Sequence, residues 1–188
     1  DSLTKNTPKA LVLVANKPFI FHQIELLKQQ GFSEIIISIN HLGKEIIRAL
    51  GDGSNMNMNI SYEDDGKFAL GTGGAIKKIS KKMNTPFFVM YGDSYLNVAF
   101  QEVEKSFEPG KGPLMVIYKN NNKYDSSNVL LNNDSIIYSK NKIPRNAIHI
   151  DYGLGIYEKS HFKKIKKSKF DLSVVQETYS KKKELQHF

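Results

Sequence analysis

Segments with the pattern of strands alternate with segments with the pattern of helices through the first half of the chain, and this alternation is typical of α/β folds. Residues 19–30 carry apolar side chains at helical spacing, and Gly31 follows as a stop signal. Residues 34–39 are rich in isoleucine and predict a strand. Residues 85–91 are almost continuously apolar, as in strands that helices cover on both faces. The same reasoning predicts further strands and helices at residues 10–14, 42–50, 58–62, 73–81 and 100–107.

The second half of the chain has a different pattern. Short strands are predicted at residues 113–118, 128–131 and 135–138, with residues 132–134 as a turn, and these favour an antiparallel meander. A longer strand follows at 148–157 and a helix at 161–167. We therefore expect an α/β sheet with a substrate-binding antiparallel extension on its C-terminal side. No repeat or linker divides the chain, which predicts one domain over residues 1–188.

The net charge is +8, and an anionic partner is the first explanation to consider. Much of the excess lies in residues 163–169 and 181–183, which we expect to be solvated faces or frayed ends of late helices. No interleaving of aromatic and basic residues accompanies it, so we expect no nucleic-acid partner. No apolar run has the length of a membrane span. Cysteine is absent, which excludes thiolate metal sites and disulfides and is compatible with a cytoplasmic protein.

A glycine-rich turn at residues 70–76 precedes a predicted helix. Gly71, Thr72, Gly73 and Gly74 would let a ligand approach the backbone, and a helix N-terminus offers free N–H groups to anions or base carbonyls. The alternative is a tight turn that serves chain reversal alone, and the glycines by themselves do not decide between the two.

Asp93 follows the apolar strand at residues 85–91, which places a carboxylate at the edge of the sheet where α/β folds bind ligands. Mg²⁺ bound to a triphosphate needs only one or two protein carboxylates. The alternative is that Asp93 or Ser94 caps the next helix. With the glycine turn nearby in the sequence, we favour the metal role for Asp93. The chain's five histidines show no metal-ligand spacing.

Other candidates are weaker when taken alone. Lys9 and Lys140 are suited to phosphate, but for each of them an exposed lysine in a loop is the favoured reading when the residue is taken alone. Asp151 and Gly153 lie in one apolar strand, where an acid could bind sugar hydroxyls and a glycine could admit a ligand. A β-bulge with a turn-capping aspartate is the alternative reading of this strand.

Taken together, residues 7–20, the glycine turn and residues 91–96 resemble the sugar-1-phosphate nucleotidyltransferases. Residues 127–129 and 149–154 resemble the branch that includes heptose-1-phosphate guanylyltransferases and N-acetylmuramate-1-phosphate uridylyltransferases. The resemblance implies a Rossmann-like fold, with a mixed, mostly parallel sheet flanked by helices and an antiparallel sugar-binding extension. It also implies a reaction in which an NTP and a sugar 1-phosphate give an NDP-sugar and pyrophosphate.

The resemblance assigns expected roles to the candidate residues. Lys9 and Lys140 would contact phosphates, the latter on the sugar, and Asp93 would bind Mg²⁺. Asn128, Asp151 and Gly153 would contact the sugar ring. The glycine turn would lie against the nucleobase and ribose, through Gly71, Thr72, Gly73 and Gly74. Ser139 departs from the family pattern, which usually has an acid before the lysine.

The family also has a triphosphate loop before the first matched residues and an acidic strand after the last. The sequence has neither, so we interpret residues 1–188 as a nucleotidyltransferase domain that is incomplete at both ends. A degenerate, non-catalytic module that binds sugar nucleotides or regulates an enzyme remains the alternative. The nucleobase, the sugar and the oligomeric state stay open, a homo-oligomer included.

Overall fold

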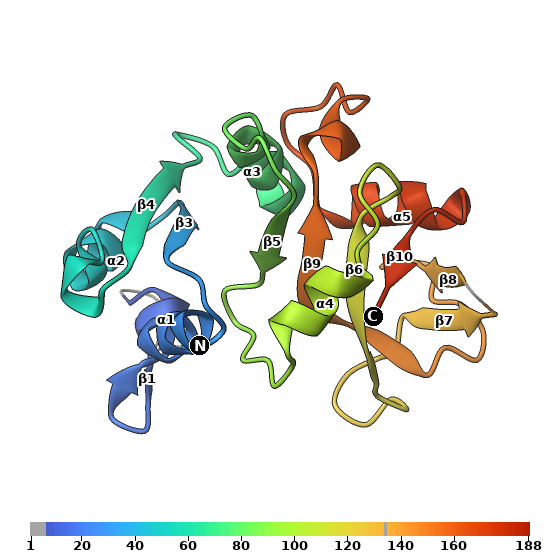
Figure 1. Ribbon diagram of the computed structural model, residues 1–188, viewed down its shortest axis with the longest axis horizontal. Coiled ribbons are helices and arrows are strands. Elements are labelled where there is room, and N and C mark those ends of the chain that lie inside the picture. The colour runs from blue at the N-terminus through green and yellow to red at the C-terminus, as the bar shows by residue number, and fades with distance from the viewer. Residues whose placement is uncertain (1–6, 134) are drawn as a thin grey trace. The chain divides into compact units, whose positions relative to one another are not determined.

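The computed structural model describes residues 7–133 and 135–188, and the chain divides into two compact units (Figure 1). The first unit comprises residues 1–69 and 92–97, and the second comprises residues 70–91 and 98–188. None of the helices formed by the described residues has the length and apolar character that crossing a membrane requires.

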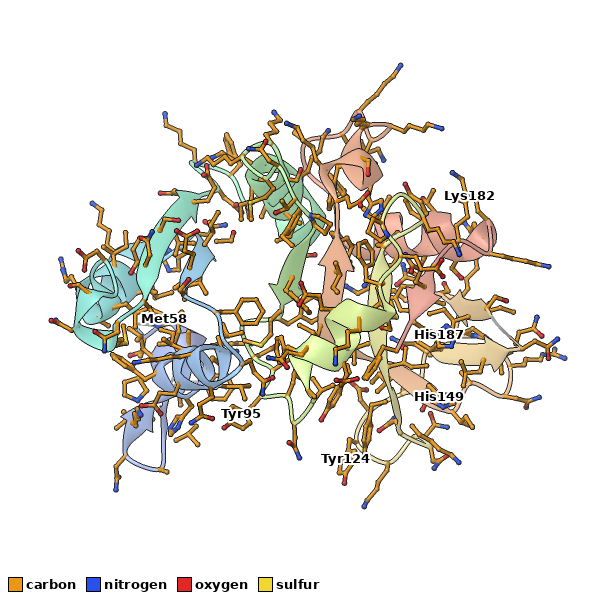
Figure 2. All side chains as sticks on the ribbon, viewed as in Figure 1. Met58, Tyr95, Tyr124, His149, Lys182 and His187 are labelled. Atoms are coloured by element: carbon orange, nitrogen blue, oxygen red, sulfur yellow. The ribbon has the colours of Figure 1, made fainter. Side chains whose placement is uncertain are left out.

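The first unit is built on a parallel strand pair joined by a helix. Strand β3 (Glu34–Ile39) pairs in parallel with β4 (Asn59–Asp64), and α2 (Gly43–Leu50) and the short helix η3 (Ser54–Met56) lie between them in the chain. Helix α1 (Phe19–Gln29) buries Ile20 and Ile24 against Met58 and Ile60. Met58 is labelled in Figure 2. Gly31, with a φ of +92°, follows the end of α1 as expected. The predicted alternation of strand and helix is thus confirmed here.

The prediction of a strand at residues 10–14 is wrong. The chain instead forms a short helix, η2 (Lys9–Leu11), and a two-residue strand, β1 (Leu13–Val14), paired with β2 (Lys17–Pro18). Ala15 and Asn16 between them have φ values of +49° and +63°, the backbone of a tight hairpin turn. The strand therefore ends at Val14 as predicted but begins late, because residues 9–11 form η2, from which Ala10 and Leu11 pack in the core around α1.

The second unit is built on a six-stranded sheet whose longest strand is β9 (His149–Tyr157). Strands β5, β6 and β7 all pair with β9 in antiparallel orientation, and β7 pairs with β8 in the same way. Among the described strands of this sheet, β10 alone pairs in parallel, with β6. The bounds of these strands are β5 (Phe87–Met90), β6 (Leu114–Lys119), β7 (Val129–Asn132), β8 (Ser135–Tyr138) and β10 (Gln186–His187).

A mixed sheet is therefore confirmed, but the expectation that most strand pairs are parallel is corrected. The described pairs are chiefly antiparallel because β9 takes three neighbours in that orientation. The meander predicted at residues 113–138 is present only in part. Strands β7 and β8 pair as an antiparallel hairpin, whereas β6 and β7 are separated in the sheet by β9, which lies between them. Asp134 of the predicted turn lies outside the described residues.

Helices flank this sheet on both faces. Phe87 and Val89 of β5 point to a core shared with α3 (Gly71–Ser80) and α5 (Ser173–Lys181). The intervening Phe88 packs on Phe100 of α4 (Phe100–Ser106), with 5.4 Å between ring centroids. Since neighbouring residues of a strand face opposite sides, α4 covers the face opposite to α3 and α5.

The helix predicted at residues 161–167 is not formed. The chain has a short helix, η4 (Lys159–Phe162), and then a turn, and the longer helix α5 follows at Ser173. His161 is buried, its Nδ1 accepts the Glu158 N–H, and its Nε2 donates to the Lys111 carbonyl at 3.1 Å. Burial lowers the pKa of His161. His161 and Phe162 are adjacent and both buried, which anchors the short helix, and the lysines that follow offer little apolar surface for extending it.

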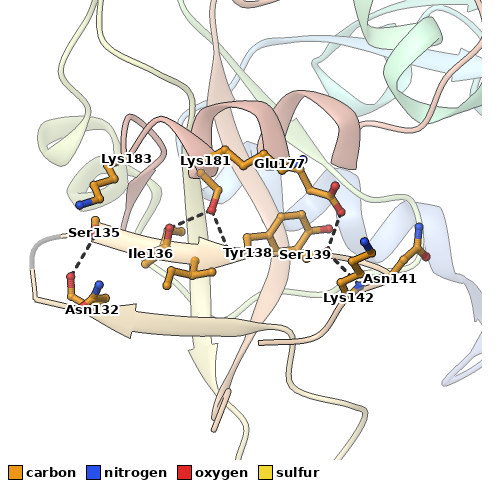
Figure 3. Close-up of a pocket in the computed structure, with 12 residues that line it drawn as sticks. Asn132, Ser135, Ile136, Tyr138, Ser139, Asn141, Lys142, Glu177, Lys181 and Lys183 are labelled. Atoms are coloured by element: carbon orange, nitrogen blue, oxygen red, sulfur yellow. Dashed lines mark hydrogen bonds between the residues drawn. The ribbon is translucent and has the colours of Figure 1, made fainter. Parts of the chain in front are cut away.

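Helix α5 covers the free edge of strand β8 through one hydroxyl group. Ser180 Oγ accepts the Tyr138 N–H at 2.9 Å and donates to the Ile136 carbonyl at 3.0 Å (Figure 3). The two backbone groups would otherwise be unpaired at a sheet edge, so Ser180 stands in for a neighbouring strand there.

We expect Ser180→Ala to lower the free energy of unfolding by about 1–3 kcal/mol, because it leaves a buried N–H and a buried carbonyl without partners. Urea denaturation measures the change. Thr178→Ala is the control, since its exposed hydroxyl donates to the Val174 carbonyl within its own helix. Equal midpoints for the Ser180 variant and the wild type would contradict the proposed bridging role.

Candidate functional site

Asp151 lies at the centre of a polar cluster on strand β9. Its Oδ1 accepts the Gly153 N–H at 2.9 Å. Its Oδ2 accepts the Tyr91 hydroxyl at 3.2 Å and Gln176 Nε2 at 3.1 Å. The register of β9 against β6 shifts at this point, and Gly153 has a φ of +85°. The bulge with a turn-capping aspartate, one of the two readings of this strand, is therefore present.

Asn128 joins the same cluster from the residue before β7. Its Oδ1 accepts the Asp151 N–H at 3.2 Å, and its own N–H donates to the His149 carbonyl at 2.9 Å. The structure thus brings together Asn128, Asp151 and Gly153, which the resemblance assigns to the sugar. Their contact with a sugar stays a prediction, because their mutual hydrogen bonds account for the grouping without a ligand.

The cluster favours neutral groups. Burial raises the pKa of Asp151, against the opposing effect of its three hydrogen bonds. Burial, and then the charge of Asp151, raise the pKa values of Tyr91 and Tyr157, so both hydroxyls remain donors. Gln176 Nε2 also contacts the Tyr157 hydroxyl at 3.1 Å, whereas the buried Gln176 Oε1 has no hydrogen-bond partner within the described part of the chain.

Residues 70–74 of the glycine turn lie against residues 168–172, called here the facing segment, from much later in the chain. The Gly74 N–H donates to the Phe170 carbonyl at 3.1 Å, and the Phe170 N–H donates to the Leu70 carbonyl at 2.9 Å. The Leu172 N–H donates to Thr72 Oγ1 at 2.9 Å. Three hydrogen bonds therefore hold the start of α3 to the residues that lead into α5.

At Gly73 and Gly74 the facing segment comes too close for a side chain. A Cβ atom at Gly73 would lie 2.4 Å from the Phe170 ring, and one at Gly74 would lie 2.2 Å from the Ser168 carbonyl oxygen. Gly71 has a φ of +73°, which favours glycine. Packing alone therefore accounts for Gly73 and Gly74, which are buried. Gly71 and Thr72 are exposed, and nucleotide contact at the turn stays a prediction.

Lys140 lies beside the facing segment. Its Nζ contacts Asp171 Oδ2 at 2.6 Å, and the two side chains are about half exposed. Asp171 Oδ1 also accepts the Ser173 N–H at 2.9 Å. Burial alone would raise the pKa of Asp171, but the hydrogen bonds from Lys140 and Ser173 hold it below its usual value. Lys140 is thus a cation whose position Asp171 sets.

Lys9 and Asp93 belong to the first unit. Lys9 is exposed at the start of η2, which packs on α1. Asp93 is exposed in a turn, and the next residue is fixed by a 2.8 Å hydrogen bond from Gln23 Nε2 of α1 to the Ser94 carbonyl. The capping alternative is wrong, because the next helix, α4, begins at Phe100 with Ala99 before it.

Metal binding by protein groups alone has little support. Among the described residues, no group of three or more histidine or acidic side chains could hold a metal ion. An exposed carboxylate such as Asp93 still fits Mg²⁺ that arrives with a triphosphate, because phosphate oxygens and water complete that coordination.

Sequence reasoning missed several members of the site. Tyr91 directly precedes the Gly92-Asp93 pair, where the apolar pattern predicts a strand and gives no sign of a site residue. Three more members, which follow the lysine-rich segment (residues 163–169), are Asp171, Gln176 and Glu177. The sequence pattern predicted a helix at residues 161–167 and none at the position of α5. The one available signal was the apolar spacing of Leu172, Val175 and Tyr179, which now proves to face the core.

The fold matches solved nucleotidyltransferase structures. The chain superimposes on a putative glucose-1-phosphate thymidylyltransferase from Bacillus anthracis with a TM-score of 0.81 at 22% identity, covering 99% of this chain and 79% of that one. HddC from Yersinia pseudotuberculosis gives a TM-score of 0.74 at 25% identity, covering 90% and 75%. These likenesses confirm the mixed α/β fold with flanking helices.

The sequence places the chain in a family. Residues 2–128 match the nucleotidyl transferase family model, and the chain belongs to that family. It is 41% identical over 99 residues to N-acetylmuramate alpha-1-phosphate uridylyltransferase of Neisseria meningitidis, covering 52% of this chain and 43% of that protein. It is 33% identical over 123 residues to mannose-1-phosphate guanyltransferase 2 of Candida glabrata, covering 60% and 33%. The matches thus span less than half the length of these relatives.

We expect Asp151→Asn to raise stability relative to the wild type as the pH rises. The ordinary pKa of the carboxyl is 3.8 and the folded value is higher, so the native state holds a proton that the unfolded chain has lost. Wild-type stability from this group is full below the ordinary pKa and is lost as the pH rises through the folded value. The asparagine does not ionise, and its amide can donate to Gln176 Oε1 once that side chain rotates.

Thermal melting at pH 4 and pH 8 tests this expectation. The difference in midpoint between variant and wild type should shift in favour of the variant at pH 8. Asp125→Asn, at an exposed site, is the control. The same difference at both pH values would show that Asp151 does not titrate as described.

We expect Gly74→Ala to destabilise the protein, although alanine favours a helix by about 1 kcal/mol over glycine. The added methyl would overlap the Ser168 carbonyl, and such overpacking costs about 1–3 kcal/mol. Urea unfolding gives the balance of the two effects. Gly92→Ala is the matched control, because a Cβ there meets nothing within 4 Å. A more stable Gly74 variant would refute the close contact.

Proposed function

We propose that the protein transfers a nucleotidyl group from an NTP to a sugar 1-phosphate, giving an NDP-sugar and pyrophosphate. The observation that carries the proposal is the family match over residues 2–128, which includes Lys9, the glycine turn and Asp93 in one span. The names of three relatives, a uridylyltransferase, a guanyltransferase and a thymidylyltransferase, each give a sugar 1-phosphate as the acceptor of the nucleotide.

The reaction needs positioning and charge neutralisation more than covalent help from the protein. An oxygen of the sugar phosphate attacks the α-phosphorus of the NTP, a new P–O bond forms, and the bond to the β-phosphate breaks to release pyrophosphate. In this proposal Lys140, fixed by Asp171, holds the sugar phosphate, and Lys9 contacts phosphate near the reacting centre. Gly71 and Thr72, the exposed part of the glycine turn, lie against the nucleotide.

The polar cluster around Asp151 supports a role in sugar recognition. Both Asp151 oxygens bond within the protein, so we assign the carboxylate to orienting its neighbours. Asn128 accepts the Asp151 N–H through Oδ1, and its Nδ2 group takes no part in that bond. We propose that this amide donates to a sugar hydroxyl.

Asp93 is our proposed Mg²⁺ ligand. When bound, the metal would neutralise charge on the phosphate oxygens of the nucleotide. The carboxylate would tie that ion, and with it the triphosphate, to the turn that Gln23 holds in place.

A panel of NTPs and sugar 1-phosphates, with pyrophosphate release as the readout, tests the activity of the full-length protein. Turnover of one pair supports the transferase. Binding of NDP-sugars without turnover of any pair would favour the alternative, a non-catalytic module.

We expect Asp93→Ala to lower the rate of pyrophosphate release by at least about 100-fold, because metal charge stabilisation contributes several kcal/mol to such reactions. The thermal midpoint should stay unchanged, since the side chain is exposed. Glu104→Ala, which removes an exposed carboxylate from α4, is the control. Full activity in the Asp93 variant, or its unfolding, would remove Asp93 from the metal site.

A further inference from the structure

A carboxylate from helix α5 holds the turn that follows strand β8. Glu177 Oε1 accepts the Ser139 hydroxyl at 3.1 Å (Figure 3). The same oxygen accepts the Lys140 backbone N–H at 2.9 Å. Lys140 is therefore fixed at both ends, at its backbone by Glu177 and at its ammonium group by Asp171.

Ser139 is matched to this carboxylate. Its hydroxyl donates to Glu177, and its oxygen accepts the Lys142 N–H at 3.1 Å. An ionised acid at position 139 could accept from Lys142 but could not donate to Glu177, and it would place two negative charges in contact. A hydroxyl, which both donates and accepts, therefore fits this arrangement at the position where the resemblance leads one to expect an acid.

We propose that Glu177 is a positioning residue for sugar-phosphate binding, supplying from α5 the carboxylate that position 139 lacks. This inference rests on the proposed function, because it assumes that Lys140 holds the sugar phosphate. Glu177 fixes the backbone of Lys140 while Asp171 orients the ammonium group, so the lysine meets the phosphate already ordered. Glu177 is partly buried and borders a hollow of about 530 Å³ with Ser139 and Lys142, so the turn it holds is reached from solvent.

The test compares Glu177→Ala with Glu177→Gln in the full-length protein. The alanine removes the acceptor, and we expect KM for the sugar 1-phosphate to rise about tenfold, as for loss of a hydrogen bond to a charged group. The glutamine keeps an acceptor oxygen and should restore KM to within about twofold of the wild type. KM for the NTP should stay unchanged in both. Glu184→Ala removes an exposed carboxylate beyond the end of α5 and is the control.

A second comparison uses the pairing of Ser139 with Glu177. Ser139→Glu should raise KM for the sugar 1-phosphate in the wild type, because the two carboxylates repel. The same change should cost less in the Glu177→Ala background, where the repulsion is absent. Independent effects of the two substitutions would contradict the pairing.

The outcomes separate this inference from the proposed function. If the wild type turns over a sugar 1-phosphate but Glu177→Ala keeps its KM, or raises both KM values together with a lower thermal midpoint, the positioning role is overturned and the transferase stands. If the wild type turns over nothing, calorimetry with glucose 1-phosphate, mannose 1-phosphate and N-acetylmuramate 1-phosphate decides. If Glu177→Ala binds a sugar 1-phosphate more weakly than the wild type while Glu177→Gln does not, the positioning role of Glu177 is supported even though the protein does not catalyse the transfer. If the wild type binds none of the three sugar phosphates, the positioning role and the proposed function are both overturned.

Discussion

The contact between the glycine turn and the facing segment is the constraint on which the candidate site of the second unit depends. It brings the start of α3 against residues 168–172 closely enough to exclude a Cβ atom. Because the facing segment leads directly into α5, this contact also sets where that helix begins. Asp171 and Glu177 reach Lys140 from there, and Gln176 reaches Asp151. The structural role of Gly73 and Gly74 is thus to allow the backbone of the facing segment to pack closely against the start of α3.

The second unit gathers polar groups where an apolar core would be simpler to pack. Asp151 takes three hydrogen bonds from the protein, and one buried oxygen of Gln176 has none among the described residues. Buried polar groups cost stability unless their partners are complete, so the cluster is a specific arrangement of donors and acceptors that the fold maintains at some energetic cost. Strand β9 makes this feasible, because its bulge at Gly153 turns the backbone toward the carboxylate.

Sequence patterns predicted the structural features that depend on residues close together in the chain. The strand–helix alternation of the first unit and the stop at Gly31 follow from local spacing, and both are present. The grouping of Asn128, Asp151 and Gly153 was implied by the family resemblance, and the structure supplies the hydrogen bonds behind it. The partners of Lys140 were not predictable, because they lie 31 and 37 residues away and depend on where α5 packs. The lysines of residues 163–167 have the polar character of a helix surface, which predicted a helix there. The structure has the short helix η4 instead, and His161 in it is buried.

The hydrogen bond from Leu172 to Thr72 joins residues that are 100 positions apart. Closing so long a loop is entropically unfavourable until the rest of the sheet has formed, which makes this contact a late event in folding. During synthesis the glycine turn is complete some time before the segment that packs on it leaves the ribosome. The start of α3 therefore acquires its final environment only as the last part of the described chain emerges, and the candidate site matures after the strands that carry it.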